Sequence, residues 1–189
     1  MEFSMKQLTD VPVFAHFDKN SPITSDTIMA KTVTTLVGEI YIKANQYGLS
    51  HLSLVEAKLE MSEQTELNHK AFSYLIQTEK ELEEYFSGKR QHFSVPLAPK
   101  GTEFQKAVWQ ALLALDYGTT CCYADIANKI NRPKAVRAVG AANGANSIAI
   151  IIPCHRVIGK NGSLTGYAYG LEMKKSLLKL ENQNKSFPC

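Results

Sequence analysis

The sequence predicts an α/β protein with two domains. We expect a small N-terminal α/β domain with an antiparallel sheet over residues 1–97, and a mostly helical C-terminal domain with a winged-helix-like helix-turn-helix over residues 98–189. Three observations lead to this expectation: a β-rich stretch followed by a helical one, a proline-containing linker near the middle of the chain, and two short helical segments around Pro133. A chain of 189 residues has room for two such domains.

The first domain begins with a segment, residues 1–30, in which apolar residues alternate around Pro12, so an extended arm or an edge strand is expected. Residues 32–44 are rich in β-branched and aromatic side chains, and residues 49–55 have the same strand character. Residues 45–48 lie between them and are typical of a turn. The two stretches are therefore expected to pair as a hairpin.

A helix is expected to cover this sheet. Apolar residues recur at helical spacing through residues 72–86, and the serine and glycine at residues 87–88 suit a helix end. Residues 93–100 contain two prolines and form the predicted linker. Beyond the linker, Thr102 and Gln105 have the spacing of a capping box, so another helix should start there.

Two short helices joined by a tight turn form a predicted helix-turn-helix. They span residues 123–130 and 134–143, and Pro133 suits the first turn of the second helix. The second helix is rich in alanine and glycine, which gives it a low, smooth surface. That surface suits either close packing within the protein or close approach to a DNA groove. Trp109, in the preceding helix, is expected in the core rather than against a base.

The segment on which the function depends is an isoleucine-rich run, residues 147–152, which Pro153 ends because it fixes φ and has no N–H. A thiol, an imidazole and a guanidinium follow at Cys154, His155 and Arg156. This order predicts a buried element that delivers a cysteine to a pocket. A thiol attacks as the thiolate, which a neighbouring histidine or positive charge favours. The alternative is a small buried cysteine with solvated neighbours.

Composition and charge exclude several classes of protein. No apolar run is long enough to span a membrane and no signal peptide is visible, so a cytoplasmic location with reduced thiols is expected. The four cysteines and five histidines lack zinc-binding spacing, and we expect no metal and no cofactor. A net charge of +3 is weak evidence for a nucleic-acid partner, but basic residues cluster in the C-terminal half. They are Lys129, Arg132, Lys134, Arg137, Arg156 and Lys160.

Three stretches together resemble the O6-alkylguanine-DNA alkyltransferases. They are Pro-Cys-His-Arg-Val at residues 153–157, Arg-Ala-Val-Gly-Ala-Ala-Asn-Gly-Ala-Asn at residues 137–146 and Gly-Ser-Leu-Thr-Gly-Tyr at residues 162–167. The resemblance extends over most of residues 101–181. It implies a monomeric DNA repair enzyme, a methylated-DNA–protein-cysteine S-methyltransferase. Such an enzyme extrudes O6-alkylguanine, with O4-methylthymine as a further candidate, from double-stranded DNA at the minor groove and moves the alkyl group irreversibly to Cys154.

The resemblance also assigns roles in the reaction. Cys154 is the nucleophile, His155 takes the thiol proton through a water, and Glu181 orients the histidine. Direct contact between Cys154 and His155 is not required, because neighbours on an extended chain point to opposite sides. Tyr123 donates near ring N3 of the leaving guanine, and Asn146 ties the helix-turn-helix to the Cys154 loop. Taken alone, Glu181 equally fits an acid on a helix surface, and Tyr123 a core residue.

The same resemblance implies contacts to the base and to DNA. Tyr167 packs against the extruded base, and the N–H of Ala168 donates to its O6 atom. Arg137 fills the gap left in the base stack, which a planar guanidinium suits. Pro153 and Arg156 support the active-site loop. The DNA-binding residues on the second helix are Lys134, Arg137, Ala138 and Gly140.

The sequence departs from the family pattern at three places. Ser147 replaces a proline, Cys121-Cys122 stands where a small residue such as serine precedes the tyrosine, and Tyr169 stands where glycine is more common. We expect Tyr169 to narrow the pocket or shift the preferred size of the alkyl group. Two other classes fit less well: a protein that binds damage without repairing it would lack the cysteine, and a cysteine hydrolase would leave the helix-turn-helix unexplained.

Overall fold

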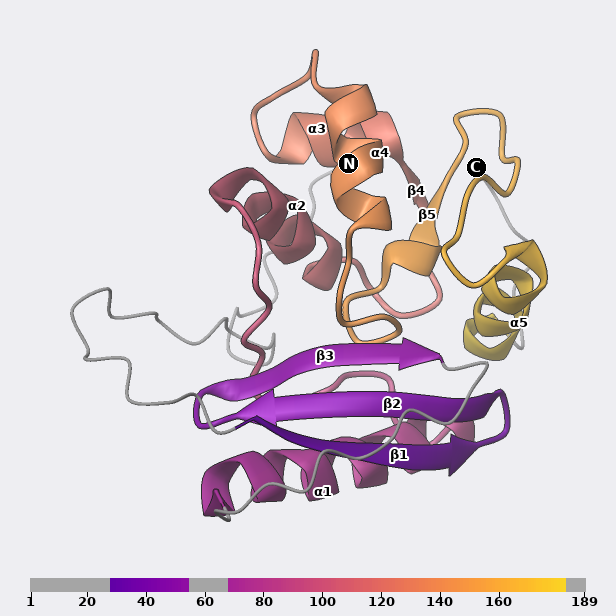
Figure 1. Cartoon of the computed structure of the whole chain (residues 1–189). Helices are drawn as coiled ribbons and strands as arrows, with labels where there is room; N and C mark the ends of the chain where they lie inside the picture. Colours follow the sequence, from indigo (N-terminus) through magenta and orange to yellow (C-terminus); the bar gives the residue numbers. More distant parts are fainter. Residues whose placement is uncertain (1–27, 55–67, 183–189) are drawn as a thin grey trace.

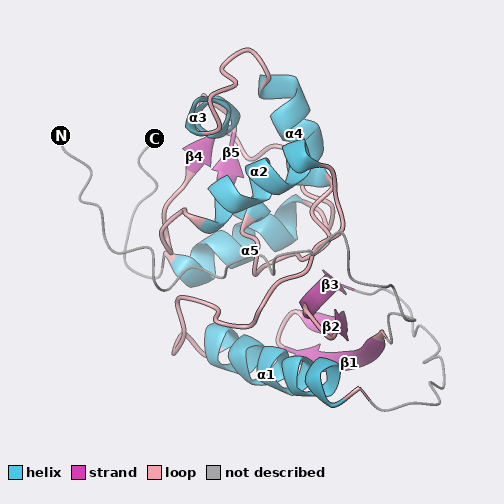
Figure 2. Cartoon of the chain, turned by 90° about the vertical axis from the view of Figure 1, so that its left-hand side faces the viewer, coloured by secondary structure: helices cyan, strands magenta, loops and turns pink. Residues whose placement is uncertain are grey.

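The computed structural model describes residues 28–54 and 68–182, and its helical C-terminal half lies beside a small sheet (Figure 1). The sheet is antiparallel in the order β1-β2-β3. Helix α1 lies along one face of the sheet, and the other helices gather beyond the β3 edge (Figure 2). The elements are β1 (Met29–Thr35), β2 (Gly38–Asn45), β3 (Gly48–Leu54) and α1 (His69–Phe86). The predicted α/β fold is confirmed, while most of the arm predicted at residues 1–30 lies outside the described residues.

The stretch at residues 32–44 forms parts of two strands rather than the single one expected from its composition. The chain turns at Leu36 and Val37, whose strand-like character hides the turn from sequence reasoning. Leu36 is 86% exposed, and Gly38 has a φ of +109°, a conformation that favours glycine. The turn predicted at residues 45–48 is confirmed, because it joins β2 to β3. The sheet therefore contains two hairpins instead of one.

Helix α1 begins and ends at residues with clear capping roles. The Asn68 side chain accepts a hydrogen bond from the Ala71 N–H at 3.0 Å, and Gly88 follows the helix with a φ of +73°. The spacing of apolar residues predicted the helix correctly but only part of its buried face. Phe72 and Ile76 are 46% and 43% exposed. The buried side chains include Ala71, Leu75, Leu82, Tyr85 and Phe86.

The outer edge of β3 pairs with two segments of the C-terminal half. Leu49 forms an isolated parallel bridge with Leu97 in the linker. Leu52 donates its N–H to the Ser147 carbonyl at 2.8 Å, and its own carbonyl accepts the Ala149 N–H at 3.0 Å. A covered edge cannot pair with another chain. The sheet therefore holds the segment that leads to Cys154. These hydrogen bonds connect the N-terminal elements to the part of the chain that contains the cysteine.

The C-terminal half is mostly helical and contains the predicted helix-turn-helix in α3 and α4. Helix α4 begins two residues later than expected, because the Ala135 N–H closes a turn on the Arg132 carbonyl at 2.8 Å. Short strands β4 and β5 pair in parallel beside these helices. The elements are α2 (Glu103–Leu113), β4 (Cys121–Cys122), α3 (Tyr123–Lys129), α4 (Val136–Gly144), β5 (Val157–Ile158) and α5 (Leu171–Glu181).

Two further predictions about α2 are confirmed. Thr102 and Gln105 form a reciprocal capping box at its start. Trp109 is 1% exposed and donates its indole N–H to the Ala142 carbonyl at 2.9 Å, which ties α2 to α4. Across the described ranges, no helix has the length and apolar character needed to cross a membrane.

Candidate active site

The cysteine at the centre of the site lies in a buried turn. Residues 148–152 are almost fully buried, and Ile150 has a φ of +69°, a strained conformation for a β-branched residue. Residues Cys154–Arg156 then form a single 3-10 turn, so the extended backbone expected at this point is wrong. Cys154 and Arg156 are 6% exposed and His155 is fully buried, which excludes the alternative of solvated neighbours. A buried element delivers the cysteine, as predicted.

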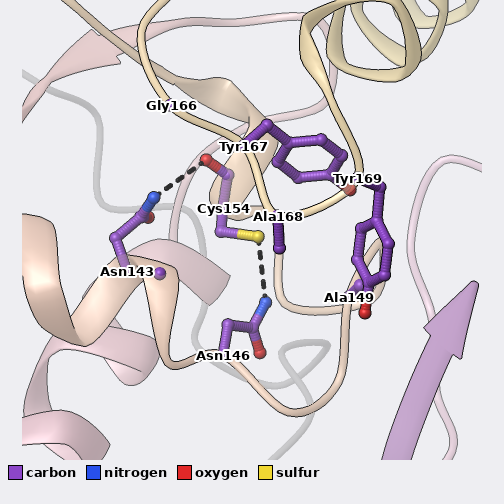
Figure 3. Close-up of a pocket in the computed structure, with 9 residues that line it drawn as sticks. Asn143, Asn146, Ala149, Cys154, Gly166, Tyr167, Ala168 and Tyr169 are labelled. Atoms are coloured by element: carbon purple, nitrogen blue, oxygen red, sulfur yellow. Dashed lines mark hydrogen bonds between the residues drawn. The ribbon is translucent and has the colours of Figure 1, made fainter.

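The Asn146 amide reaches the sulfur of Cys154. Its Nδ2 donates to Sγ at 3.1 Å (Figure 3) and to the Ile152 carbonyl at 2.8 Å, while its Oδ1 accepts the Ile148 N–H at 3.0 Å. Burial raises the pKa of the Cys154 thiol, and the Asn146 hydrogen bond and the positive charge of Lys174 act against that rise. Asn146 therefore both holds the loop and stabilises negative charge on the sulfur.

Glu181, at the end of α5, joins the two side chains that follow the cysteine. His155 Nε2 lies 2.8 Å from one carboxylate oxygen, and Arg156 Nε donates to the other at 2.8 Å. Although burial alone would raise the pKa of the Glu181 carboxyl, His155 and Arg156 hold it well below its usual range. Glu181 is thus a buried carboxylate rather than an acid on a helix surface, and Arg156 locks its orientation.

Sequence reasoning missed two residues of the site, Tyr85 and Lys174. The Tyr85 hydroxyl, from α1, donates to Glu181 at 2.8 Å, so an N-terminal element completes the carboxylate's surroundings. Lys174 is fully buried and donates to the carbonyls of Val157 and Thr165 at 2.6 and 2.8 Å. One signal was available: Lys174 lies seven positions before Glu181, so both fall on the same, buried face of α5.

A small cavity of about 20 Å³ opens beside the sulfur (Figure 3). The rings of Tyr167 and Tyr169 meet edge to face on one side of it, with centroids 5.5 Å apart. The predicted site residues Cys154, Asn146, Tyr167 and Ala168 therefore share one cavity. Tyr169 forms part of its wall, and the expectation that it narrows the pocket stays a prediction. The lining residues are Asn143, Gly144, Asn146, Ala149, Cys154, Gly166, Tyr167, Ala168 and Tyr169.

The remaining predicted residues are not among those that line this cavity. Tyr123, at the start of α3, accepts a hydrogen bond from the Thr165 hydroxyl at 3.2 Å. A Cβ atom on Gly140 would lie 3.8 Å from the Tyr123 ring, an ordinary contact distance, so packing against Tyr123 does not by itself require a glycine here. Pro153 is buried directly before the cysteine. On α4 and the turn before it, three predicted DNA-binding residues are exposed: Lys134, Arg137 and Ala138.

The two adjacent cysteines that depart from the expected pattern lie outside the cavity. Cys121 is half-buried, and burial and the negative charge of Asp125 raise the pKa of its thiol to about 12. The Asp125 carboxylate accepts the Cys122 N–H at 2.8 Å, which caps α3. The cap is therefore intact, and Cys121 stays a protonated, poorly nucleophilic thiol. The expectation that the chain needs no metal stays a prediction.

Two family models match the chain. One, described as the DNA binding domain of 6-O-methylguanine DNA methyltransferase, matches residues 103–183, and the other, described as its ribonuclease-like domain, matches residues 28–99. A methylated-DNA–protein-cysteine methyltransferase of Methanosarcina barkeri is 50% identical over 150 residues, which are 78% of this chain and 93% of that protein. The chain belongs to the 6-O-methylguanine DNA methyltransferase family.

Solved structures of this methyltransferase family have the same fold. The O6-methylguanine methyltransferase of Mycobacterium tuberculosis is 41% identical, with a TM-score of 0.70, and the match covers 84% of this chain and 95% of that one. The crystal structure of Mycobacterium tuberculosis OGT in complex with DNA also matches at 41% identity and a TM-score of 0.70, covering 82% and 93%. The two-part architecture is therefore that of the methyltransferase family along nearly the whole length of these relatives.

Proposed function

We propose that the protein repairs DNA by moving the alkyl group of O6-alkylguanine in double-stranded DNA irreversibly to Cys154. The observation that carries the proposal is a buried thiol at a cavity, hydrogen-bonded by Asn146 and followed by a histidine paired with Glu181. Family membership, and relatives that are methylated-DNA–protein-cysteine methyltransferases, support the same chemistry. We expect a monomer that works in the cytoplasm, where thiols stay reduced.

His155 is suited to accept the thiol proton. With its Nε2–H donated to Glu181, the neutral ring keeps a lone pair on Nδ1. That nitrogen is buried, and none of the described residues hydrogen-bonds to it. A water between Sγ and Nδ1 would carry the proton to the ring. Glu181 then stabilises the imidazolium that forms, as an orienting carboxylate does for other nucleophile–histidine pairs.

The transfer itself is a displacement at carbon. The Cys154 sulfur bonds to the alkyl carbon as the bond between that carbon and guanine O6 breaks, and the electron pair leaves with the guanine. Tyr123 neutralises the leaving group by donating its hydroxyl hydrogen towards ring N3. Because the Thr165 hydroxyl donates to Tyr123, the tyrosine's own hydrogen is free for this role. The product is a thioether, whose carbon–sulfur bond is not readily reversed, so each molecule acts once.

The target base must leave the duplex to reach this sulfur, since the alkyl carbon is not accessible to in-line attack within paired DNA. Arg137 and Lys134 are exposed on the helix-turn-helix and would contact the minor groove, with Arg137 taking the place of the extruded base. Tyr167 and the Ala168 N–H would then hold the base. A cavity of about 20 Å³ holds little more than a water, so we expect the Tyr167–Tyr169 wall to move as the base enters.

The proposal is tested by intact and peptide mass spectrometry after the protein meets an excess of duplex DNA containing O6-methylguanine. We expect one methylene's mass added to the Cys154 peptide and none to the peptide carrying Cys121 and Cys122. A Cys154→Ser variant should remain unmodified, while a Cys121→Ser variant should react like the wild type. Tight binding of the damaged duplex with no gain in mass would instead identify a protein that recognises damage without repairing it.

A further inference from the structure

Asn143 carries a buried hydrogen-bond acceptor that no described residue uses. The residue lies in α4 and is 4% exposed. Its Nδ2 points to the Cys154 carbonyl oxygen at 3.4 Å (Figure 3), while its Oδ1 is buried without a partner within the described ranges. Rotating the amide by half a turn would place Oδ1 against that carbonyl oxygen, so the hydrogen bond to Cys154 fixes which atom remains unpaired.

The second asparagine at the cavity makes the contrast clear. Asn146 uses both ends of its amide, with Nδ2 donating to the Cys154 sulfur and Oδ1 accepting the Ile148 N–H at 3.0 Å. Asn143 lines the same cavity. A buried acceptor without a partner destabilises a folded protein, and an apolar side chain of similar size would avoid that cost. An acceptor kept unpaired beside a ligand cavity therefore indicates a donor on the ligand.

The chemistry of the substrate supplies one such donor. Alkylation at O6 fixes the guanine ring in a form that has no hydrogen on N1, so N1, N3 and N7 are all acceptors. The exocyclic 2-amino group is then the only strong donor on the base. It lies on the same edge of the ring as the O6 substituent. When the alkyl carbon of the base lies at the Cys154 sulfur, the 2-amino group therefore faces the same side of the cavity as that sulfur.

We propose that Asn143 Oδ1 accepts a hydrogen bond from the 2-amino group of the extruded base, so that Asn143 selects O6-alkylguanine over bases that lack this group. The inference rests on the proposed function and adds to it a residue that determines specificity. O6-alkylhypoxanthine and O4-methylthymine both lack the amino group and would leave the acceptor unpaired in the complex. A site built around a hydrogen bond rejects ligands that cannot form it.

The test compares rates of Cys154 alkylation by two duplexes of the same sequence, one with O6-methylguanine and one with O6-methylhypoxanthine. The wild type should react at least about tenfold faster with the guanine duplex. In an Asn143→Leu variant this ratio should fall by about tenfold, because the rate on O6-methylguanine drops while the rate on O6-methylhypoxanthine changes little. A purely structural role would slow both reactions equally and leave the ratio unchanged.

Control variants distinguish a failure of the inference from a failure of the proposed function. Asn128→Leu makes the same substitution at an exposed position on α3 and should keep the wild-type ratio. An Asn143→Ala variant provides a second removal of the acceptor if the leucine variant does not fold. A wild-type ratio near one, or an unchanged ratio in a folded Asn143 variant, overturns the inference while leaving the proposed function intact. Failure of both duplexes to alkylate Cys154 would count against the proposed function itself.

Discussion

The imidazole of His155 and the carboxylate of Glu181 meet at 2.8 Å with both side chains fully buried. Burial lowers the pKa of His155, although its hydrogen bond and charge interaction with Glu181 act in the opposite direction. Burial also withdraws Glu181 from water, and the adjacent cation of Arg156 helps to keep it ionised. The pair therefore combines a neutral base with a permanent anion, which is the arrangement needed to accept a proton and stabilise the result.

Replacing Glu181 with glutamine should impair both reaction and stability. The rate of Cys154 alkylation by O6-methylguanine duplex should fall at least about a hundredfold, because the imidazolium loses its counter-charge. Arg156 would remain buried without a carboxylate, which destabilises the fold by about 3–5 kcal/mol. Single-turnover kinetics and urea unfolding measure the two effects. A Glu172→Gln variant, on the exposed side of α5, is the matched control, and equal behaviour of the two variants would contradict the assignment.

The free energy of unfolding should decrease as the pH falls below about 6.5. The pKa of His155 is lowered in the folded state, so the unfolded chain binds the proton first and is favoured as the pH drops. The depressed pKa of Glu181 acts in the same direction at lower pH, where the unfolded carboxyl takes up a proton near pH 4. Urea unfolding between pH 8 and pH 4 tests this. A gain in stability on acidification from pH 7 to pH 5.5 would be incompatible with a neutral buried His155.

Tyr169 should set the size of alkyl group that the site accepts. A Tyr169→Gly variant removes one wall of the cavity and should react about tenfold faster with O6-benzylguanine, with little change for O6-methylguanine duplex. The Tyr169 hydroxyl also accepts a hydrogen bond from the Leu54 backbone. A Tyr169→Phe variant removes that contact and keeps the ring, so its size preference should match the wild type. If both variants keep the wild-type preference, the ring does not limit the pocket.

Arg137 should matter for duplex DNA but not for a free base. An Arg137→Ala variant should lose about 1–3 kcal/mol of transition-state stabilisation with O6-methylguanine duplex, because the guanidinium no longer fills the stack. Its rate with free O6-benzylguanine should stay close to that of the wild type, since Arg137 is exposed and not among the residues that line the cavity. Equal losses on both substrates would show that the substitution acts on the site itself.

Local sequence signals predicted most of the elements, while the long-range contacts remained hidden. The capping box at Thr102 and the turn at Pro133 depend on neighbours within a few positions, so they are visible in the chain. Tyr85 contributes to the site only because α1 packs against the C-terminal half, and its bond to Glu181 spans 96 positions. The single turn that positions His155 and the unpaired Oδ1 atom of Asn143 likewise depend on packing within the fold rather than on a local sequence pattern.

The carboxylate that completes the site comes from α5, 26 positions after the histidine that it orients. The site is thus assembled only when α5 docks against the turn that contains His155. A chain truncated before α5 would keep Cys154 and His155 but leave the imidazole without its anionic partner, so we expect such a chain to react slowly with O6-methylguanine duplex.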